Sequence, residues 1–359
     1  MQNKYYSIDK VLKMGQEENS NFIFIYGGKS KGKSYQAKKV LMIENYLKTG
    51  KRFILLRRYD TEVDKSKTEL YFRDYLANEN LLELTDGKYN NITYISNKIF
   101  FTFTDDKGKI IKKEHIGYAI PLNCEQNFSS ILSEKDVSVI VFEEFQSRTT
   151  YLTNEADKLM FFYSTVDREQ GTTKIYFMGN AISKACPYWS YFGILNVIKE
   201  QRSNTIRSYT IDGKKILIEK TPVFNARRTT VGQSAGAISR GDWYSEKQPH
   251  VKMKGHKRGL LFVNFDFSGL KFAGELNTDE KGAPYWFIRS VESFKKKNVY
   301  TVTNKFMPGL NIGASIYTIG AKKFQELAKR TFTKDKIFFS TDEAGTDFNT
   351  ACIFRIREV

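Results

Sequence analysis

The stretch from Gly27 to Ser34 has the residue types and spacing of a phosphate-binding loop. It fits the pattern G-x-x-x-x-G-K-[ST] at every position, and such loops point backbone N–H groups at phosphate oxygens. The pattern assigns the β- and γ-phosphates to Lys33 and a Mg²⁺ ligand to the hydroxyl of Ser34. A chance Gly- and Lys-rich turn is the alternative, which the flanking apolar run and helix-forming stretch disfavour. The expected nucleotide-binding residues are Gly27, Gly28, Lys29, Ser30, Lys31, Gly32, Lys33 and Ser34.

Two consecutive carboxylates follow the apolar run Val139–Phe142. Acids at the end of a buried strand beside a phosphate-binding loop hold Mg²⁺ and orient or deprotonate the attacking water. We assign the Mg²⁺ shell to Glu143 and the water to Glu144. The first acid is usually Asp, so the longer Glu143 leaves the division of roles open, and an edge strand that ends in solvated acids is the alternative.

A polar side chain and two arginines complete the candidate catalytic set. Asn180 follows the apolar run Lys174–Met178, where an amide can sense the γ-phosphate, although a plain turn residue is nearly as good an interpretation. Transition-state charge on the γ-phosphoryl group is commonly neutralised by an arginine from a neighbouring subunit. Arg168 is the first candidate for this role and Arg148 the second, with solvated arginines as the alternative.

Arg57 and Arg58 end another apolar run, at the sheet edge where we expect the phosphate-binding loop. From this position they could contact phosphate or DNA. Solvation at the protein surface is an equally good prediction for both.

The elements that must position these residues are predicted from short apolar runs without alternation, which fit strands buried on both faces. Helical stretches separate them, so residues 21 to about 183 predict an α/β domain with a mainly parallel sheet. Between the second and third runs, the alternating segments Ile92–Ile95, Lys98–Thr104 and Lys109–His115 predict an antiparallel insertion with a turn at Asp105–Gly108. The four apolar runs are Phe22–Tyr26, Arg52–Leu56, Val137–Phe142 and Lys174–Met178.

The second half of the chain predicts a smaller α+β domain. A short helix at Tyr191–Glu200, a hairpin within Gln201–Lys220 and a connecting helix at Asn225–Arg240 come first. We expect an ATPase domain at residues 1–198, a linker region at 199–240 and a basic nucleic-acid-binding domain at 241–359. Expected strands are Gly259–Phe267, Leu270–Leu276, Tyr285–Val291, Asn298–Thr303, Lys336–Ser340 and Thr350–Ile356, with a helix at Ala321–Thr331.

Composition narrows the class of protein. The net charge is +17, and it is uneven, because residues 1–198 carry 28 Lys and Arg against 24 Asp and Glu, whereas residues 199–359 carry 29 against 16. This asymmetry predicts a polyanionic partner for the second half, with an unspecific basic surface as the alternative. No apolar run reaches the length of a membrane span, the first residues lack the apolar region of a signal peptide, and the three cysteines are scattered. We therefore expect a reduced, cytosolic protein without a membrane partner.

Asp266 lies within an otherwise apolar hairpin, where ribonuclease H-type nucleases carry a metal-binding Asp. Further carboxylates would have to converge on it to hold two metal ions. None of the candidates lies in a recognisable pattern, so we favour a domain without nuclease activity whose basic residues bind phosphates. The candidate acids are Glu292, Asp342, Glu343 and Asp347, and the basic clusters are Arg227, Arg228, Lys252, Lys254, Lys257, Arg258 and Lys295–Lys297.

The order of these motifs resembles a known family. The phosphate-binding loop, the paired acids, Ser164–Arg168 and Phe177–Ala181 look like the DNA-packaging ATPases of small tailed phages with protein-primed linear genomes (Picovirinae type). These are relatives of FtsK/HerA translocases and terminase large subunits. The resemblance covers most of the chain, but only the phosphate-binding loop is individually specific.

The resemblance implies an ATP- and Mg²⁺-dependent ring, with a pentamer expected. The ring would dock on the phage portal in the host cytoplasm and drive double-stranded DNA into a prohead. It also implies the roles given above for Lys33, Ser34, Glu143, Glu144 and Arg168, and a ribonuclease H-like C-terminal domain that has lost cleavage. A structural packaging RNA is a further partner in some relatives. Two alternatives stay open: a terminase-like enzyme that also cuts DNA, and a non-motor switch in which ATP gates binding.

Overall fold

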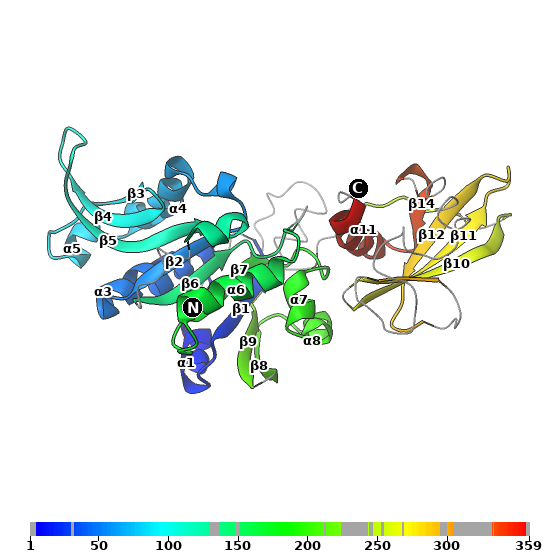
Figure 1. The fold of residues 1–359 in the computed structure, drawn as a ribbon, viewed down its shortest axis with the longest axis horizontal. Coiled ribbons are helices and arrows are strands. Elements are labelled where there is room, and N and C mark those ends of the chain that lie inside the picture. The colour runs from blue at the N-terminus through cyan, green and yellow to red at the C-terminus, as the bar shows by residue number, and fades with distance from the viewer. Residues whose placement is uncertain are drawn as a thin grey trace.

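The computed structural model consists of two lobes (Figure 1). We call residues 5–223 the N-terminal lobe and residues 247–356 the C-terminal lobe. The expected helices at Asn225–Arg240 and Ala321–Thr331 lie outside the residues that the structure describes. Those residues are 5–29, 32–128, 136–147, 151–211, 213–223, 243, 247–252, 255–267, 269–294, 300–303, 332 and 334–356.

The N-terminal lobe is built on a nine-stranded sheet in the order β3-β4-β5-β2-β6-β7-β1-β9-β8. The six strands from β5 to β9 in this order are mutually parallel. All four expected apolar runs form strands of this group, so the α/β prediction is confirmed. The parallel strands are β1 (Phe22–Gly27), β2 (Arg52–Arg57), β5 (Ile110–Pro121), β6 (Val137–Glu143), β7 (Lys174–Asn180) and β9 (Lys214–Lys220).

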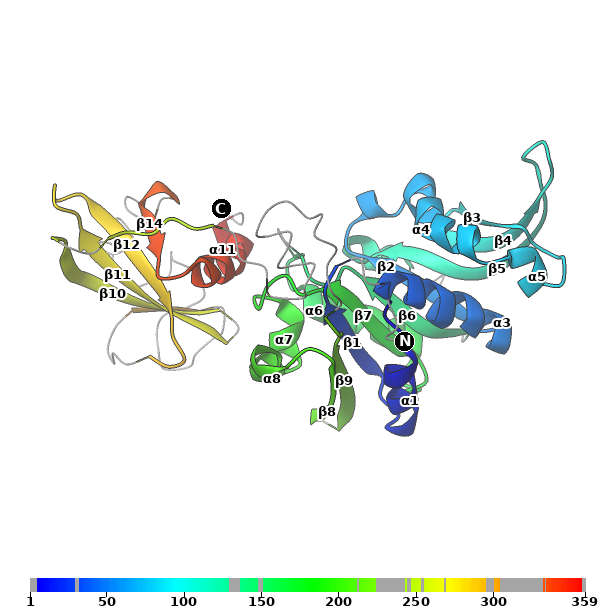
Figure 2. The same cartoon turned by 180° about the vertical axis from the view of Figure 1, so that it is seen from behind.

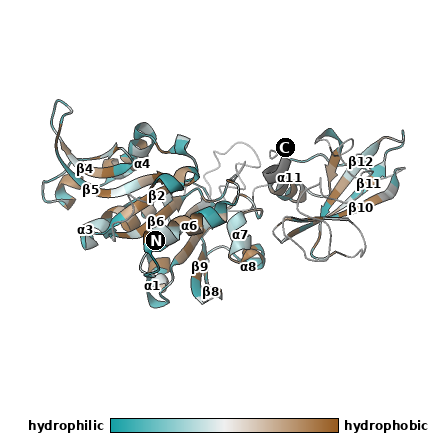
Figure 3. Cartoon of the chain, in the orientation of Figure 1, coloured by the Kyte–Doolittle hydropathy of each residue, from teal (hydrophilic) through white to brown (hydrophobic). Residues whose placement is uncertain are grey.

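The central strands are buried on both faces because their side chains alternate between two apolar layers. Phe22, Phe24 and Tyr26 of β1 lie in one hydrophobic cluster, and Ile23 and Ile25 lie in the other. These strands carry hydrophobic colours in Figure 3. A strand with two buried faces reads as a continuous apolar run, which explains why these strands were predictable.

Helices cover both faces of the sheet (Figures 1 and 2). On one face lie α6 (Glu155–Asp167), α7 (Pro187–Tyr191) and α8 (Leu195–Glu200). On the other lie α1, α4 and the helix that follows the phosphate-binding loop. The latter has three consecutive segments, α2, a π-helical stretch and α3. The bounds on this face are α1 (Asp9–Glu17), α2 (Lys33–Gln36), the π-helical Ala37–Glu44, α3 (Asn45–Thr49), α4 (Lys65–Asn78) and α5 (Leu81–Leu84).

The expected antiparallel insertion is present as β3 (Asn91–Ile95), β4 (Lys98–Thr104) and the first half of β5. Its turn projects beyond the rest of the lobe (Figure 1). The strand expected to end at His115 continues to Pro121, because its second half is buried and pairs with β2. The insertion is therefore continuous with the central sheet.

The first sheet extends beyond the domain end expected at residue 198, which lies inside α8. The hairpin of β8 (Thr205–Ile211) and β9 follows, and β9 pairs with β1 in parallel from Ile216 to Lys220. The polar, basic composition of this stretch suggested a linker, but Ile216, Leu217 and Ile218 are fully buried against the sheet. The expected boundary is thus too early for this sheet.

The C-terminal lobe contains a five-stranded mixed sheet in the order β13-β10-β11-β12-β14. Strands β10, β11 and β12 form an antiparallel meander, with β13 parallel to β10 and β14 parallel to β12. The expected strands before residue 341 are therefore confirmed. Their bounds are β10 (Lys257–Phe267), β11 (Leu270–Thr278), β12 (Pro284–Ser290), β13 (Tyr300–Thr303) and β14 (Ile337–Phe339).

The strand predicted at Thr350–Ile356 is wrong, because these residues end the helix α11 (Asp342–Ile356). The helix begins where the hydroxyl of Thr341 accepts a hydrogen bond from Ala344 N at 3.0 Å. Phe348 then packs edge-on against Phe265 and Phe272 of the sheet, at ring-centre distances of 5.1 and 5.2 Å. Packing of one helix face against the sheet outweighs the strand propensity of its last residues.

Candidate nucleotide site

The phosphate-binding loop connects β1 to α2, as the sequence predicted. At Gly27 a side chain would collide with the neighbouring β9 segment, since a Cβ atom there would lie 2.1 Å from Thr221 Oγ1. Gly32 has a φ of +94° and directly precedes the first helical residue, Lys33, a backbone conformation that favours glycine. Ser30 and Lys31 lie outside the described residues. The two described ends of the loop therefore both require glycine.

The Lys33 ammonium group lies between the loop and the end of β7. Lys33 is 6% exposed, and its Nζ donates to Gly28 O at 2.5 Å and to Asn180 Oδ1 at 3.3 Å. Asn180 stands beside Gly27 in the parallel register of β1 and β7. The structure thus brings the expected lysine and the expected sensor together at the carboxyl edge of the sheet.

Glu143 ends β6 and faces the helix that follows the loop. Ser34 Oγ donates to Glu143 Oε2 at 3.0 Å, and the Tyr71 hydroxyl donates to Glu143 Oε1 at 2.7 Å. The carboxylate is 4% exposed, and burial raises its pKa although Tyr71, Arg57 and Ser34 act to lower it. A hydroxyl and a carboxylate oxygen side by side are the ligands that Mg²⁺ prefers at phosphate sites. The donor set therefore fits the expected ion.

Glu144 has a different environment from its neighbour. Its backbone has a φ of +57°, and its side chain is 62% exposed. Arg57 Nη2 lies 3.2 Å from Glu144 Oε2 and 3.0 Å from Glu62 Oε1. The structure thus provides one buried acid beside the Ser34 hydroxyl and one accessible acid held by an arginine.

The prediction that Arg58 is solvated or contacts phosphate is wrong, because Arg58 is only 4% exposed. Its Nε donates to Glu155 Oε2 at 2.8 Å, and its Nη atoms donate to the carbonyl oxygens of Glu144 (3.1 Å) and Phe145 (2.7 Å). Tyr188 also donates to the Glu155 carboxylate, at 2.6 Å. Arg58 therefore fixes the backbone that carries Glu144.

Arg168 lies near the amino end of β7, whereas the phosphate-binding loop lies at the carboxyl ends of the parallel strands. It is exposed and ends α6, just before the loop that leads into the first residue of β7. Near it, Asn21, which precedes β1, donates to Gly171 O at 2.8 Å. The seven residues of β7 span roughly 20 Å, so Arg168 is not part of the site of its own chain. Arg148 lies outside the described residues, four positions after Glu144.

Sequence reasoning missed two contacts of the site. Tyr71 comes from α4, and no local pattern distinguishes it from other aromatic residues on that helix. Gln146 accepts a hydrogen bond from Ile182 N at 2.8 Å and so connects the segments after β6 and β7. A polar residue shortly after the paired acids was the available signal for Gln146, whereas Tyr71 had none.

The acids of the C-terminal lobe do not converge. Asp266 Oδ1 accepts from Gly269 N at 3.1 Å within its own hairpin turn. Asp342 contacts His250 at 2.9 Å, and Asp347 accepts from Ser183 of the N-terminal lobe at 3.2 Å. Glu343 pairs with Lys184. Within the part of the chain that the structure describes, no three His, Cys, Asp or Glu residues are grouped so that they could hold a metal ion.

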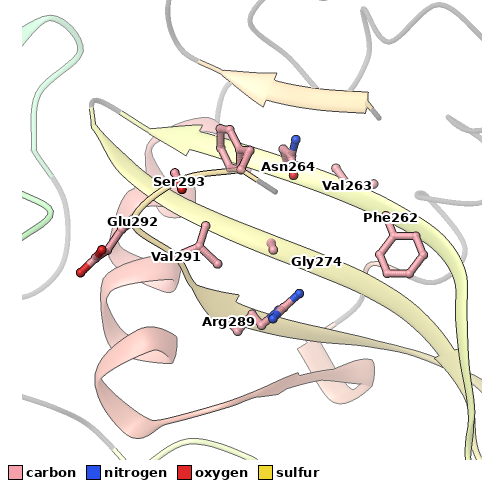
Figure 4. Close-up of a pocket in the computed structure, with 10 residues that line it drawn as sticks. Phe262, Val263, Asn264, Gly274, Arg289, Val291, Glu292 and Ser293 are labelled. Atoms are coloured by element: carbon pink, nitrogen blue, oxygen red, sulfur yellow. The ribbon is translucent and has the colours of Figure 1, made fainter. Parts of the chain in front are cut away.

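A pocket of about 260 Å³ lies on the outward face of the second sheet. Its polar side chains are Asn264, Arg289, Glu292 and Ser293 (Figure 4), and Phe262 and Phe294 supply aromatic ones. Arg289 also contacts Glu275 at 3.3 Å. With a single lining carboxylate, the pocket does not have the donor set of a two-metal nuclease site.

None of the helices that could be assessed, those of the described residues, is both long and apolar enough to span a bilayer.

Comparison with known proteins agrees with the architecture and the motifs. The family model described as "Podovirus DNA encapsidation protein (Gp16)" matches residues 2–233. The DNA packaging protein of Bacillus phage phi29 is 30% identical over 309 residues, which are 83% of this chain and 82% of that protein. The DNA packaging protein of Bacillus phage PZA is 26% identical over the same shares.

Among solved structures, the bacteriophage Phi-29 viral genome packaging motor assembly has a similar fold. Its TM-score is 0.52 at 22% identity, over 95% of this chain and 96% of that one. The resemblance to phage DNA-packaging proteins is thereby confirmed. This chain belongs to the podovirus DNA encapsidation protein (Gp16) family.

Proposed function

We propose that this phage DNA packaging protein is an ATP-hydrolysing ring motor that drives double-stranded DNA into a prohead. One observation carries the proposal. A phosphate-binding loop, a buried acid and an accessible acid meet at one sheet edge, through the Lys33–Asn180, Ser34–Glu143 and Arg57–Glu144 contacts. A protein that only gated binding with nucleotide would not need the second, accessible acid.

These contacts support the following proposed roles of the site residues. In this proposal, Lys33 and the N–H groups of the loop bind the β- and γ-phosphates of ATP, and Asn180 senses the γ-phosphate. Ser34 and Glu143 would hold Mg²⁺, which would supply positive charge to neutralise the phosphate oxygens. Glu144 Oε2 orients the attacking water and accepts its proton, while Arg57 keeps this carboxylate in position.

A ring, with a pentamer expected, would supply the remaining positive charge from a neighbouring subunit. Arg168 is exposed and lies roughly one strand length from its own loop, so any contact it makes with a nucleotide is in trans. Mixing Arg168→Ala subunits with Lys33→Ala subunits should restore partial hydrolysis, because some interfaces then pair an intact loop with an intact arginine. If only the matching Arg148→Ala mixture restores hydrolysis, the trans arginine is Arg148.

The C-terminal lobe is the proposed DNA-binding part. With the boundary moved to the end of the N-terminal lobe, residues 1–223 carry 34 Lys and Arg against 27 Asp and Glu, and residues 224–359 carry 23 against 13. The positive surplus therefore still favours the shorter, second part. The meander β10–β12 with β13 parallel to β10 also fits a ribonuclease H-like fold, although β14 lies beside β12. We infer a domain of this type without nuclease activity.

Binding of the full chain to duplex DNA tests this assignment. About five phosphate contacts would give a log–log salt slope of roughly −4 to −5. Substituting both Lys252 and Lys257 by Ala should make the slope shallower by about one to two. The matched control replaces Lys107 and Lys109, on the projecting hairpin of the N-terminal lobe, by Ala, and should leave the salt slope unchanged. An equal loss in the control, or a flat salt response of the wild type, would contradict the assignment.

The central test is the ATPase activity of the purified chain alone, with duplex DNA, and with DNA plus proheads. We expect hydrolysis that DNA and proheads stimulate, and none from folded Lys33→Ala. Near-normal turnover in that variant would remove the proposal. DNA-independent turnover would favour a nucleotide-gated switch, and Mg²⁺- or Mn²⁺-dependent nicking would favour a terminase-like nuclease.

The same reactions identify the partners. We propose the host cytoplasm as the place of action and the portal of the prohead as the docking partner. Ribonuclease treatment of the proheads would show whether a structural packaging RNA is also required.

A further inference from the structure

The two oxygens of the Glu143 carboxylate have different partners. Oε2 accepts from Ser34 Oγ at 3.0 Å, on the side of the phosphate-binding loop. Oε1 accepts from the Tyr71 hydroxyl at 2.7 Å, on the side of α4. Only the first oxygen therefore lies beside the hydroxyl that we assign to Mg²⁺, while the second is held from behind by a phenol.

Tyr71 is itself fixed to the helix that follows the loop. Lys38 Nζ, from the π-helical segment, lies 4.5 Å from the centre of the Tyr71 ring and donates to Tyr71 O at 2.7 Å. The same ammonium group pairs with Asp74, one turn further along α4. The Tyr71 ring also meets Phe72 edge-on, with ring centres 5.2 Å apart. The hydroxyl thus projects from a ring that is held on several sides.

A glutamate at this strand end needs such support more than an aspartate would. Its side chain has one more methylene group and one more rotatable bond, so its carboxylate can take up more positions. A metal ligand acts well only if its own hydrogen bonds fix its orientation. The phenol of Tyr71 is the group that restricts Glu143 on the side away from Ser34.

We propose that Tyr71 is a positioning residue that orients the Glu143 carboxylate, so that Oε2 is presented to Mg²⁺ together with the Ser34 hydroxyl. The inference rests on the proposed function, because it concerns the same site. Tyr71 does not contact the ion or the nucleotide in this arrangement. Its effect should therefore appear in the affinity for Mg²⁺ and not in nucleotide binding without the ion.

Tyr71→Phe tests the proposal, since it removes the hydroxyl but keeps the ring and the backbone carbonyl that Lys38 contacts. The first readout is the binding of a fluorescent ADP analogue, mant-ADP, titrated with Mg²⁺ and repeated in EDTA. The half-saturating Mg²⁺ concentration should rise about 10-fold, within the range for lost supporting hydrogen bonds at metal sites. Binding in EDTA and the thermal unfolding midpoint should stay near wild type.

Tyr75→Phe is the matched control. Tyr75 lies one turn further along α4, and within the described residues its buried hydroxyl has no hydrogen-bond partner. This variant should leave the Mg²⁺ titration unchanged. A shift in Tyr71→Phe no larger than in Tyr75→Phe would overturn the proposal and leave a packing role for Tyr71.

The double variant separates orientation from packing. With Glu143→Asp, the shorter carboxylate is out of reach of the phenol, so adding Tyr71→Phe should change the Mg²⁺ requirement less than it does in the wild type. Equal, additive shifts would contradict a role through Glu143. If the wild type itself shows no Mg²⁺-dependent mant-ADP binding, the proposed function fails together with this inference. The ATPase rates of wild type and Lys33→Ala test the proposed function separately.

Discussion

The two lobes use their acidic side chains in opposite ways. In the N-terminal lobe, Glu143 ends a central parallel strand and contacts Ser34, and Glu144 follows it and contacts Arg57. In the C-terminal lobe, each acid has a different partner: Asp266 accepts from its own hairpin turn, Asp342 contacts His250, and Asp347 accepts from Ser183 of the other lobe. Both lobes contain candidate acids, yet within the described residues only the first set converges with the phosphate-binding loop.

The difference follows from topology. Parallel strands end at the same edge of a sheet, so residues that are distant in sequence meet there without further adjustment. The mixed sheet of the C-terminal lobe sends strand ends to both edges, and α11 directs Asp347 toward Ser183 of the N-terminal lobe. Asp347 and Glu343 of this lobe therefore contact the other lobe, whereas Glu143 and Glu144 of the first lobe lie at the candidate nucleotide site.

The largest expected effect concerns turnover. Glu144→Gln should retain nucleotide binding but reduce ATP hydrolysis by about 10²–10⁴-fold, the usual contribution of a group that moves a proton. Asp347→Asn, in the C-terminal lobe, should change turnover far less. Steady-state ATPase rates and mant-ADP binding measure both. If Glu143→Gln is the variant that binds nucleotide and does not hydrolyse it, the two acids have exchanged roles.

The next effect concerns stability at the same sheet edge. Arg58→Ala leaves the Glu155 carboxylate buried without its main partner, and breaking a buried ion pair in this way costs about 3–5 kcal/mol of unfolding free energy. Urea unfolding at neutral pH measures the loss. Arg73→Ala, at an exposed position on α4, is the control and should change little. Equal stability of the two variants would contradict the structural role of Arg58.

The sequence was sufficient for the parts of the site that depend on local patterns. The loop glycines, the paired acids and the doubly buried strands each show a signature within about ten residues. Tyr71 shows none, because its partner Glu143 lies 72 positions away and only the fold brings the two together.

Tertiary context also overrode two local predictions. Arg58 looks like a surface residue in the sequence, whereas the Glu155 carboxylate and two carbonyl oxygens take the place of water around it. Thr350–Ile356 has the β-branched and aromatic residues of a strand, whereas the preceding turn of α11, anchored by Phe348, continues through it as a helix. Neither partner was visible from the sequence alone.

The smallest expected effect is a pH dependence of the contact between the lobes. Asp347 is 8% exposed, and burial together with the nearby Glu343 raises its pKa to about 6, although Lys184 and the hydrogen bond from Ser183 act in the opposite direction. A raised carboxyl pKa means that the folded chain binds this proton more tightly than the unfolded chain. The stabilisation that Asp347 contributes is therefore fully present below the unfolded pKa and is lost as pH rises toward 6.

Asp347→Asn removes this titration but keeps an oxygen that can accept from Ser183. Relative to wild type, the variant should gain unfolding free energy between about pH 4 and pH 6, at no more than roughly 1.4 kcal/mol per pH unit, and the difference should stay constant above that range. Urea unfolding at a series of pH values measures it, with Asp279→Asn as a control, since Asp279 lies in an exposed turn of the same lobe. A difference that does not vary between pH 4 and 6 would show that Asp347 is not buried against the N-terminal lobe in solution. The Asp347–Ser183 contact, on which the comparison of the two lobes depends, would then not exist in solution.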